Sequence, residues 1–255
     1  MIVAGIDVGS RTTCALLKKD GDILSYGLID TGADSEATSR RAMDAAMAKV
    51  NFSHNDIKRI IATGYGRILV PFADKIISEI SCHARGAHWL FPGVRTVLDM
   101  GGQDCKAIRV DENGNPSNFS MNDKCAAGTG RFLEVMAETL RVPLEEMGPL
   151  SLQAKNHTTI NSFCTVFAQA EVRLLMREGI PKEEILASLH RALSVRIFAL
   201  LNKVGIEKEF VITGGIAKNI GVVRVIEERT GFSALIPDES QIVGALGAAL
   251  MAAEG

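Results

Sequence analysis

The sequence lacks the features that mark nucleic-acid-binding, membrane or secreted proteins. Its formal net charge is −2 and no basic run appears, so we expect no nucleic-acid partner and no membrane partner. The start, MIVAGIDVGSRTT, has neither the charged flank nor the long apolar core of a signal peptide. The longest apolar run, at residues 242–253, is too short to span a bilayer. These absences predict a soluble, cytoplasmic protein.

Cysteine is also scarce, with five residues scattered over a chain of 255. An odd number at wide spacing argues against a disulfide framework, and no C-x-x-C pair occurs. One chain therefore has no complete zinc or ferredoxin-type site with local ligand spacing. Most free cysteines are small buried residues, and we expect this of Cys14, Cys82 and Cys105. Cys125 and Cys164 differ, because each lies near the start of a predicted helix.

What is present is the pattern of a globular α/β protein. The chain is 47% hydrophobic and 23% charged, which predicts a sizeable core, and no linker or low-complexity tract divides it. Alternating patterns predict strands at residues 1–9, 12–19, 22–30, 56–64, 94–102, 104–111, 116–122 and 209–215. Helices are predicted at residues 35–50, 72–90, 130–141, 163–178, 182–204, 216–230 and 240–253.

Two segments of the chain share one plan. AGIDVGS at residues 4–10 and VLDMGGQD at residues 97–104 each have an apolar strand, an Asp, an apolar residue and a Gly. A polar turn and a returning strand follow in both cases. Two similar halves of this kind predict a duplicated α/β fold with a cleft between the copies.

The two turns carry residue types that suit a magnesium nucleotide. Asp7 and Asp99 end their strands, and a carboxylate there can hold Mg²⁺, usually through water. Glycine lets the backbone approach an anion, so that its N–H groups can cradle phosphate oxygens. Either turn alone could equally be an ordinary hairpin. The turn residues concerned are Gly9, Ser10, Gly101 and Gly102.

A third glycine pair strengthens the nucleotide interpretation. In VITGGIAKN, residues 211–219, a strand runs into Gly214 and Gly215 and a helix begins directly after them. A helix start preceded by glycine suits the polar groups of a nucleotide. Two other nucleotide-binding motifs fit less well, because no G-x-x-x-x-G-K-[ST] occurs and AAGTGRF lacks the third glycine of a dinucleotide fingerprint.

Three glycine motifs in this order resemble the superfamily of actin, sugar kinases and heat-shock chaperone ATPases. Over nearly the whole chain, the sequence further resembles the ATPase activators of 2-hydroxyacyl-CoA dehydratases, with the ATPase subunits of benzoyl-CoA reductases as close relatives. The most specific motif is NDKCAAGTGRFL. The others are IATGYGR, SEISCHA, LDMGGQD, CTVFAQAEV, ITGGIAKNIGV and GALGAAL.

The resemblance implies a duplicated actin-like (RNase H-like) ATPase fold, with two subdomains around a nucleotide cleft. The first subdomain would comprise residues 1–93 plus 238–255, and the second, residues 94–237. It also implies a homodimer that shares one 4Fe–4S cluster, to which each subunit supplies Cys125 and Cys164. This agrees with the residue count, since such a cluster takes four thiolates and a two-fold dimer of this chain presents four. Helix N–H donors aimed at this anionic cluster would stabilise its charge.

By the same resemblance, a ferredoxin or flavodoxin would reduce the cluster, and ATP with Mg²⁺ would drive the electron to a partner dehydratase. Asp7 and Asp99 would organise the metal, and Gln103 or Asp104 would position the attacking water. We expect His83 to be a hydrogen-bonded helix residue rather than a ligand. The residues expected to bind ATP or ADP are Gly9, Ser10, Arg11, Thr12, Gly101, Gly102, Gly128, Thr129, Gly130, Gly214, Gly215, Ala217 and Gln241.

Three other functions stay open at this point. The chain could be the ATPase subunit of a benzoyl-CoA reductase. A small-molecule kinase of the same superfamily would use the same cleft, but it needs a carboxylate base beside a bound hydroxyl, and no segment marks a sugar site. A non-enzymatic actin-like or chaperone-like module would polymerise or bind peptides. Cluster-binding cysteines fit neither the kinase nor this module.

Overall fold

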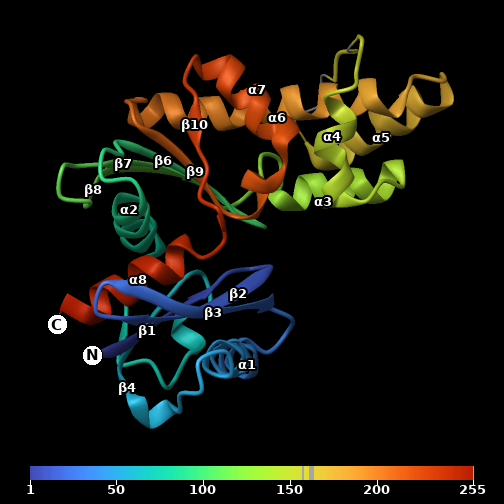
Figure 1. Ribbon diagram of the computed structural model, residues 1–255. Helices are drawn as coiled ribbons and strands as arrows, with labels where there is room; N and C mark the ends of the chain where they lie inside the picture. Colours follow the sequence, from blue (N-terminus) through green and yellow to red (C-terminus); the bar gives the residue numbers. More distant parts are fainter. Residues whose placement is uncertain (157, 161–163, 255) are drawn as a thin grey trace.

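The computed structural model describes residues 1–156, 158–160 and 164–254. The molecule has two halves, each built on one mixed sheet. The strands of the first half lie within residues 2–76 and those of the second half within residues 96–235. Helices α2 (Glu79–Leu90) and α8 (Val243–Glu254) lie between the two sheets (Figure 1). Among the described residues, no helix has the length and apolar character needed to cross a membrane.

The first sheet has the strand order β3-β2-β1-β4-β5 and the second β10-β9-β6-β7-β8. In each sheet, three consecutive strands form an antiparallel meander, and two parallel strands are added beside the first strand of that meander. The two sheets therefore repeat one plan, which confirms the predicted duplication. The strands are β1 Ile2–Val8, β2 Thr12–Lys19, β3 Asp22–Asp30, β4 Ile57–Thr63, β5 Lys75–Ile76, β6 Thr96–Met100, β7 Cys105–Val110, β8 Pro116–Asn122, β9 Phe210–Thr213 and β10 Ala234–Leu235.

Helices cover the sheets, and most of them lie in the second half. The remaining α-helices are α1 Ser35–Met47, α3 Gly130–Leu140, α4 Met147–Ser151, α5 Thr165–Arg177, α6 Lys182–Val204 and α7 Ile220–Thr230. Short 3₁₀ helices are η1 His54–Asp56, η2 Arg67–Leu69, η3 Leu144–Glu146 and η4 Gly215–Lys218. The expected start of one helix at residue 163 lies outside the described residues.

The predicted helices at 72–90 and 216–230 differ most from the structure in their bounds. The stretch at 72–90 is helical only from Glu79, because Ser78 caps α2 by accepting a hydrogen bond from the Ser81 N–H at 3.3 Å. The stretch at 216–230 is interrupted at Asn219. Its side chain accepts the Val222 N–H at 3.0 Å and so begins α7 after a separate 3₁₀ turn.

Helix α8 is the element that joins the two halves most closely. It is apolar on nearly all faces, as expected of a helix that packs against β1 and β4 on one side and α2 on the other. Glycine makes this close packing possible, since a Cβ at Gly86 of α2 would lie 3.1 Å from the Gly247 nitrogen of α8. The two helices therefore form a tightly packed layer between the sheets, directly beneath the candidate site.

Candidate functional site

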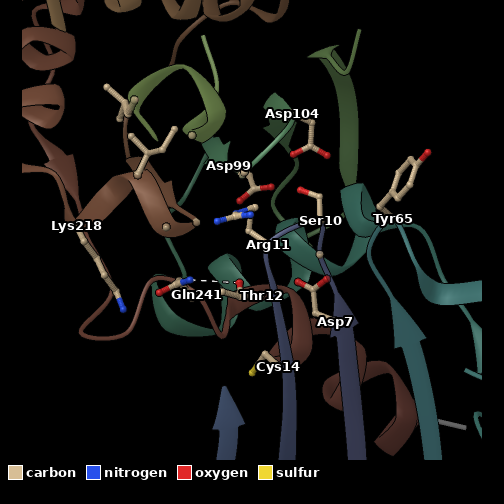
Figure 2. Close-up of a pocket in the computed structure, with 18 of the residues that line it drawn as sticks. Asp7, Ser10, Arg11, Thr12, Cys14, Tyr65, Asp99, Asp104, Lys218 and Gln241 are labelled. Carbon is tan, nitrogen blue, oxygen red and sulfur yellow. Dashed lines mark hydrogen bonds between the residues drawn. The ribbon is translucent and has the colours of Figure 1, made fainter. Parts of the chain in front are cut away.

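A pocket of about 450 Å³ opens between the two halves, a volume typical of small-molecule sites. Figure 2 shows Asp7, Ser10 and Thr12 facing Asp99 and Asp104 across it. The structure brings most of the predicted residues to this pocket. They are Asp7, Gly9, Ser10, Arg11, Thr12, Asp99, Gly101, Gly102, Asp104, Gly130, Gly214, Gly215 and Gln241.

Four predicted residues are not part of the pocket lining. Gln103 is exposed at the tip of its turn. Thr129 is buried, and its hydroxyl donates to the Ala126 carbonyl at 2.7 Å just before α3. Gly128 precedes it with a positive φ of 95°, and Ala217 is buried within η4. The pocket therefore includes Asp104 but not Gln103.

The first glycine turn (residues 9–12) and the second glycine turn (residues 101–104) close in the same way. The Gly9 N–H donates to the Thr12 carbonyl at 3.0 Å, and the Gly101 N–H donates to the Asp104 carbonyl at 3.0 Å. Each turn directly follows its strand, β1 or β6, and both turns line the pocket, so the ends of the two strands meet there. The predicted repeat thus holds at the level of single hydrogen bonds.

Lys106 on β7 is a buried cation in the wall of the pocket, with 2% of its side chain exposed. Its Nζ lies 2.9 Å from Asp104 Oδ1 and 3.2 Å from Asp99 Oδ2. A third carboxylate, Glu79 on α2, lies 3.4 Å away. Burial alone would lower the pKa of Lys106, but the three carboxylates raise it above its ordinary value. The lysine therefore stays charged and fixes these carboxylates.

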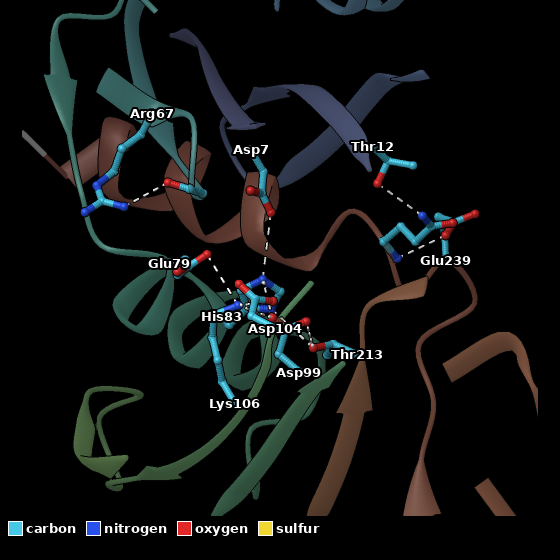
Figure 3. Close-up of polar contacts among 12 residues, drawn as sticks. Asp7, Thr12, Arg67, Glu79, His83, Asp99, Asp104, Lys106, Thr213 and Glu239 are labelled. Carbon is cyan, nitrogen blue, oxygen red and sulfur yellow. Dashed lines mark hydrogen bonds and ion pairs between the residues drawn. The ribbon is translucent and has the colours of Figure 1, made fainter. Parts of the chain in front are cut away.

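His83 on α2 lies between the carboxylates of the two halves (Figure 3). Its Nε2 is 3.8 Å from Asp7 Oδ2 and 3.5 Å from Asp99 Oδ2. Its Nδ1 is 3.2 Å from Thr213 Oγ1, and that hydroxyl donates to Asp99 Oδ1 at 3.2 Å. His83 is thus a hydrogen-bonded helix residue, as expected, and it also links the two aspartates.

The two aspartates are not electrostatically equivalent. Burial raises the pKa of Asp7 to about 6, with only partial compensation from His83. Burial would also raise the pKa of Asp99, but His83 and Lys106 together hold it below its ordinary value. Asp7 is therefore the carboxylate whose negative charge the protein leaves least compensated, and a bound cation would supply what is missing.

The third glycine pair closes the pocket from the second half. Gly214 has a φ of 83°, and a Cβ there would lie 2.9 Å from Asp99 Oδ1, so this position requires glycine. Its N–H donates to the Ser240 carbonyl at 2.9 Å. Next to Ser240, the Gln241 side chain donates to Thr12 Oγ1 at 3.3 Å, as the dashed line in Figure 2 marks. This contact joins the segment before α8 to the first glycine turn.

The five cysteines fall into two groups. Cys14, Cys82 and Cys105 are buried, as expected, and burial raises the pKa of each thiol, that of Cys82 to about 12. Cys125 is half-buried and Cys164 is exposed at the N-cap position of α5. A metal ligand must be a thiolate that can reach its metal. Only these last two of the five cysteines meet the access requirement.

The sequence interpretation did not assign Glu79, His83 or Lys106 to the pocket, although all three line it. Lys106 could have been found, because the short turn after Met100 sets a register that places it directly across from Asp99. Glu79 and His83 are four residues apart and share one face of α2. No sequence signal places that face against the glycine turns.

A protein-family model described as the BadF/BadG/BcrA/BcrD ATPase family matches residues 4–252. The activator of lactoyl-CoA dehydratase from Anaerotignum propionicum is 46% identical, over 100% of this chain and 98% of that protein. The structure of component A of the Acidaminococcus fermentans (R)-2-hydroxyglutaryl-CoA dehydratase has a TM-score of 0.96 and 42% identity, with 100% and 98% of the two chains covered. The Clostridium difficile activator of the 2-hydroxyisocaproyl-CoA dehydratase, solved with bound ADPNP, has a TM-score of 0.95 and 41% identity, with 100% and 95% covered.

Two weaker similarities bear on the other functions left open by the sequence. A benzoyl-CoA reductase subunit from Thauera aromatica is 32% identical over 99% of this chain and 93% of that protein. A ROK family glucokinase from Streptomyces griseus is 16% identical with a TM-score of 0.62, over 100% of both chains, and shares the fold alone. The expected actin-like and sugar-kinase-like fold, with two subdomains, is therefore confirmed.

Proposed function

Because the chain belongs to the BadF/BadG/BcrA/BcrD ATPase family and is an ATPase, we propose that it activates a 2-hydroxyacyl-CoA dehydratase by ATP-driven delivery of one electron. One observation carries the proposal. The two accessible cysteines stand next to helices of the half that forms one wall of the pocket, and Gly130, the first residue of α3, lines that pocket. A nucleotide in the pocket can therefore act on α3, the helix that follows Cys125.

In the pocket, the two aspartates would hold Mg²⁺ through water, and the glycine turns would contact the phosphates. Within the described ranges, no three His, Cys, Asp or Glu side chains are arranged to hold a metal alone, so phosphate oxygens and water would complete its ligands. When bound, Mg²⁺ neutralises phosphate charge. We assign the positioning of the attacking water to Asp104, since it faces the pocket and Lys106 fixes it.

The proposed cluster site needs a second copy of the chain. Each copy offers Cys125 and Cys164, so a two-fold pair offers the four thiolates that a 4Fe–4S cluster requires. On α5, shortly after Cys164, the apolar side chains of Val166 and Phe167 are 69% and 68% exposed. Exposed apolar side chains next to the proposed cluster site are consistent with a contact between two copies of the chain. When bound, the cluster would accept one electron from a ferredoxin or flavodoxin and pass it to the dehydratase.

The proposed coupling has a thermodynamic condition. A ligand that binds two conformations equally shifts neither, so ATP and ADP must favour different arrangements of the two halves. The proposed subdomains, residues 1–93 with 238–255 and residues 94–237, place the first and second glycine turns on different bodies. A nucleotide held by both turns would therefore respond to their separation.

Anaerobic purification tests the proposal. We expect brown protein with one 4Fe–4S cluster per two chains, measured by iron, sulfide and subunit stoichiometry together with an absorption spectrum. Cys125→Ser and Cys164→Ser should be colourless yet still bind ATP, whereas Cys82→Ala, a change at a buried thiol, should keep the iron. Iron-free wild-type protein, or a full cluster in either serine variant, would rule out the cluster assignment.

A further inference from the structure

Helix α3 is tied by its backbone to the second glycine turn. The first N–H groups of a helix have no partner inside it. Here the Gly130 N–H donates to the Gly101 carbonyl at 2.9 Å, and the Arg131 N–H donates to the Gly102 carbonyl at 2.7 Å. These groups are therefore taken up by the turn and are not directed at Cys125, in contrast to our expectation that helix N–H donors face the cluster.

The same helix is tied to the first glycine turn by a side chain. Glu134 Oε1 lies 2.8 Å from Arg11 Nε, and its Oε2 lies 2.9 Å from Arg131 Nη1. Glu134 is only 16% exposed, whereas Arg11 is 56% exposed and lies in the pocket lining (Figure 2). Among the described residues, this pair thus connects the first turn, on one half, to α3 on the other.

Helix α3 adjoins both segments that carry an accessible cysteine. Cys125 lies five residues before α3, in a loop whose Cys125 and Ala127 carbonyls both accept from Asn122 Nδ2 at 2.9 Å. On the far side, Gln169 of α5 donates to Thr139 of α3 at 2.9 Å. Cys164 caps α5. A shift of α3 would therefore reach Cys125 through the chain that joins them and α5 through the Gln169–Thr139 hydrogen bond.

We infer that Glu134 is a positioning residue that reports nucleotide occupancy to the cysteine segments through its pairing with Arg11. The inference deepens the proposed function, because it requires that the pocket hold a nucleotide. A phosphate group carries more negative charge than a carboxylate and competes with Glu134 for the Arg11 guanidinium. Because Arg11 is 56% exposed, its pairing with Glu134 is partly screened by water, and a phosphate can replace the carboxylate as its partner. Once Arg11 turns to the phosphate, α3 is released from the first turn.

Thiol labelling tests the inference on the full chain without a cluster. The rates of Cys125 and Cys164 alkylation are measured by peptide mass spectrometry with and without Mg²⁺ and ADPNP. In wild type, the nucleotide should raise the Cys125 rate several-fold. Glu134→Gln should show the raised rate without nucleotide and no further response. The matched control is Glu138→Gln, which removes the same charge from an exposed position one turn along α3 and should behave as wild type.

A charge swap separates pairing from folding. The double variant Arg11→Glu with Glu134→Arg restores an ion pair, so its labelling without nucleotide should return to the slow rate, but nucleotide should not raise it. The inference is wrong if wild type does not respond, if Glu134→Gln responds like wild type, or if Glu138→Gln matches Glu134→Gln. The proposed function fails separately, by absence of iron after anaerobic purification, so the two failures are distinguishable.

Discussion

The first and second glycine turns have the same backbone but opposite electrostatics. In each, an aspartate is the second-to-last residue of a strand, and a glycine N–H donates the hydrogen bond that closes the turn at 3.0 Å. Across the hairpin, however, Asp99 faces Lys106, whereas Asp7 faces Cys14. His83 and Lys106 together keep Asp99 ionised, while burial raises the pKa of Asp7 to about 6. The two turns thus share one geometry, but only the second turn has a lysine that compensates the charge of its aspartate.

This difference indicates separate roles for the two carboxylates. Asp99 is held by a fixed cation and by Thr213, so its position and charge do not depend on a ligand. Asp7 has no lysine across its hairpin, and its charge is costly until a cation arrives. A magnesium nucleotide would therefore interact most strongly with the first turn, on which Arg11 also lies.

Removing the fixed cation should have the largest effect. Lys106→Met leaves three buried or half-buried carboxylates without their partner, and breaking such a group costs about 3–5 kcal/mol. Urea unfolding should show this loss in the free energy of unfolding. Lys19→Met, at an exposed position at the end of β2, is the control and should change stability by less than about 0.5 kcal/mol. Equal stabilities of the two variants would mean that Lys106 does not hold the second turn.

Neutralising Asp7 should increase the free energy of unfolding, whereas removing Lys106 should decrease it. Since the pKa of Asp7 is raised in the folded state, that state binds the proton more tightly, and stability falls as pH rises from about 4 to about 6. Asp7→Asn should abolish this fall and stabilise the protein at pH 8 by about 3 kcal/mol, the equivalent of a shift of about two pKa units. Melting temperatures recorded from pH 4 to 8 would measure it.

The equivalent variant at the second turn, Asp99→Asn, allows the two aspartates to be compared directly. Asp99→Asn should destabilise the protein at pH 8, because the lowered pKa of Asp99 means that its ionised form is favoured by folding. Asp22→Asn, at an exposed position, should change little. Both aspartate variants should lose ATP hydrolysis. Changes of the same sign in Asp7→Asn and Asp99→Asn would contradict the assigned asymmetry.

The sequence was sufficient for the repeat but not for the asymmetry. Both turns follow from local signals, namely an apolar strand, an aspartate and glycine, and the structure places them together as predicted. Lys106 is also a local consequence of strand register. His83 and Glu79 are not, because their approach depends on how α2 packs between two sheets. Likewise, Glu134 is an ordinary charged helix residue until α3 is seen beside Arg11.

The smallest expected effect concerns how each turn is held at its fourth residue. Asp104 in the second turn bonds the charged Lys106 at 2.9 Å, whereas Thr12 in the first turn accepts a neutral bond from Gln241 at 3.3 Å. Neutral hydrogen bonds contribute about 1 kcal/mol and those to charged groups about twice as much, so Gln241→Ala should cost no more than about 1 kcal/mol in urea unfolding. Gln153→Ala, at an exposed site, is the control. A loss in Gln241→Ala as large as that in Asp104→Asn would show that the first turn is held as firmly as the second, and the difference between the two turns would then not extend to their fourth residues.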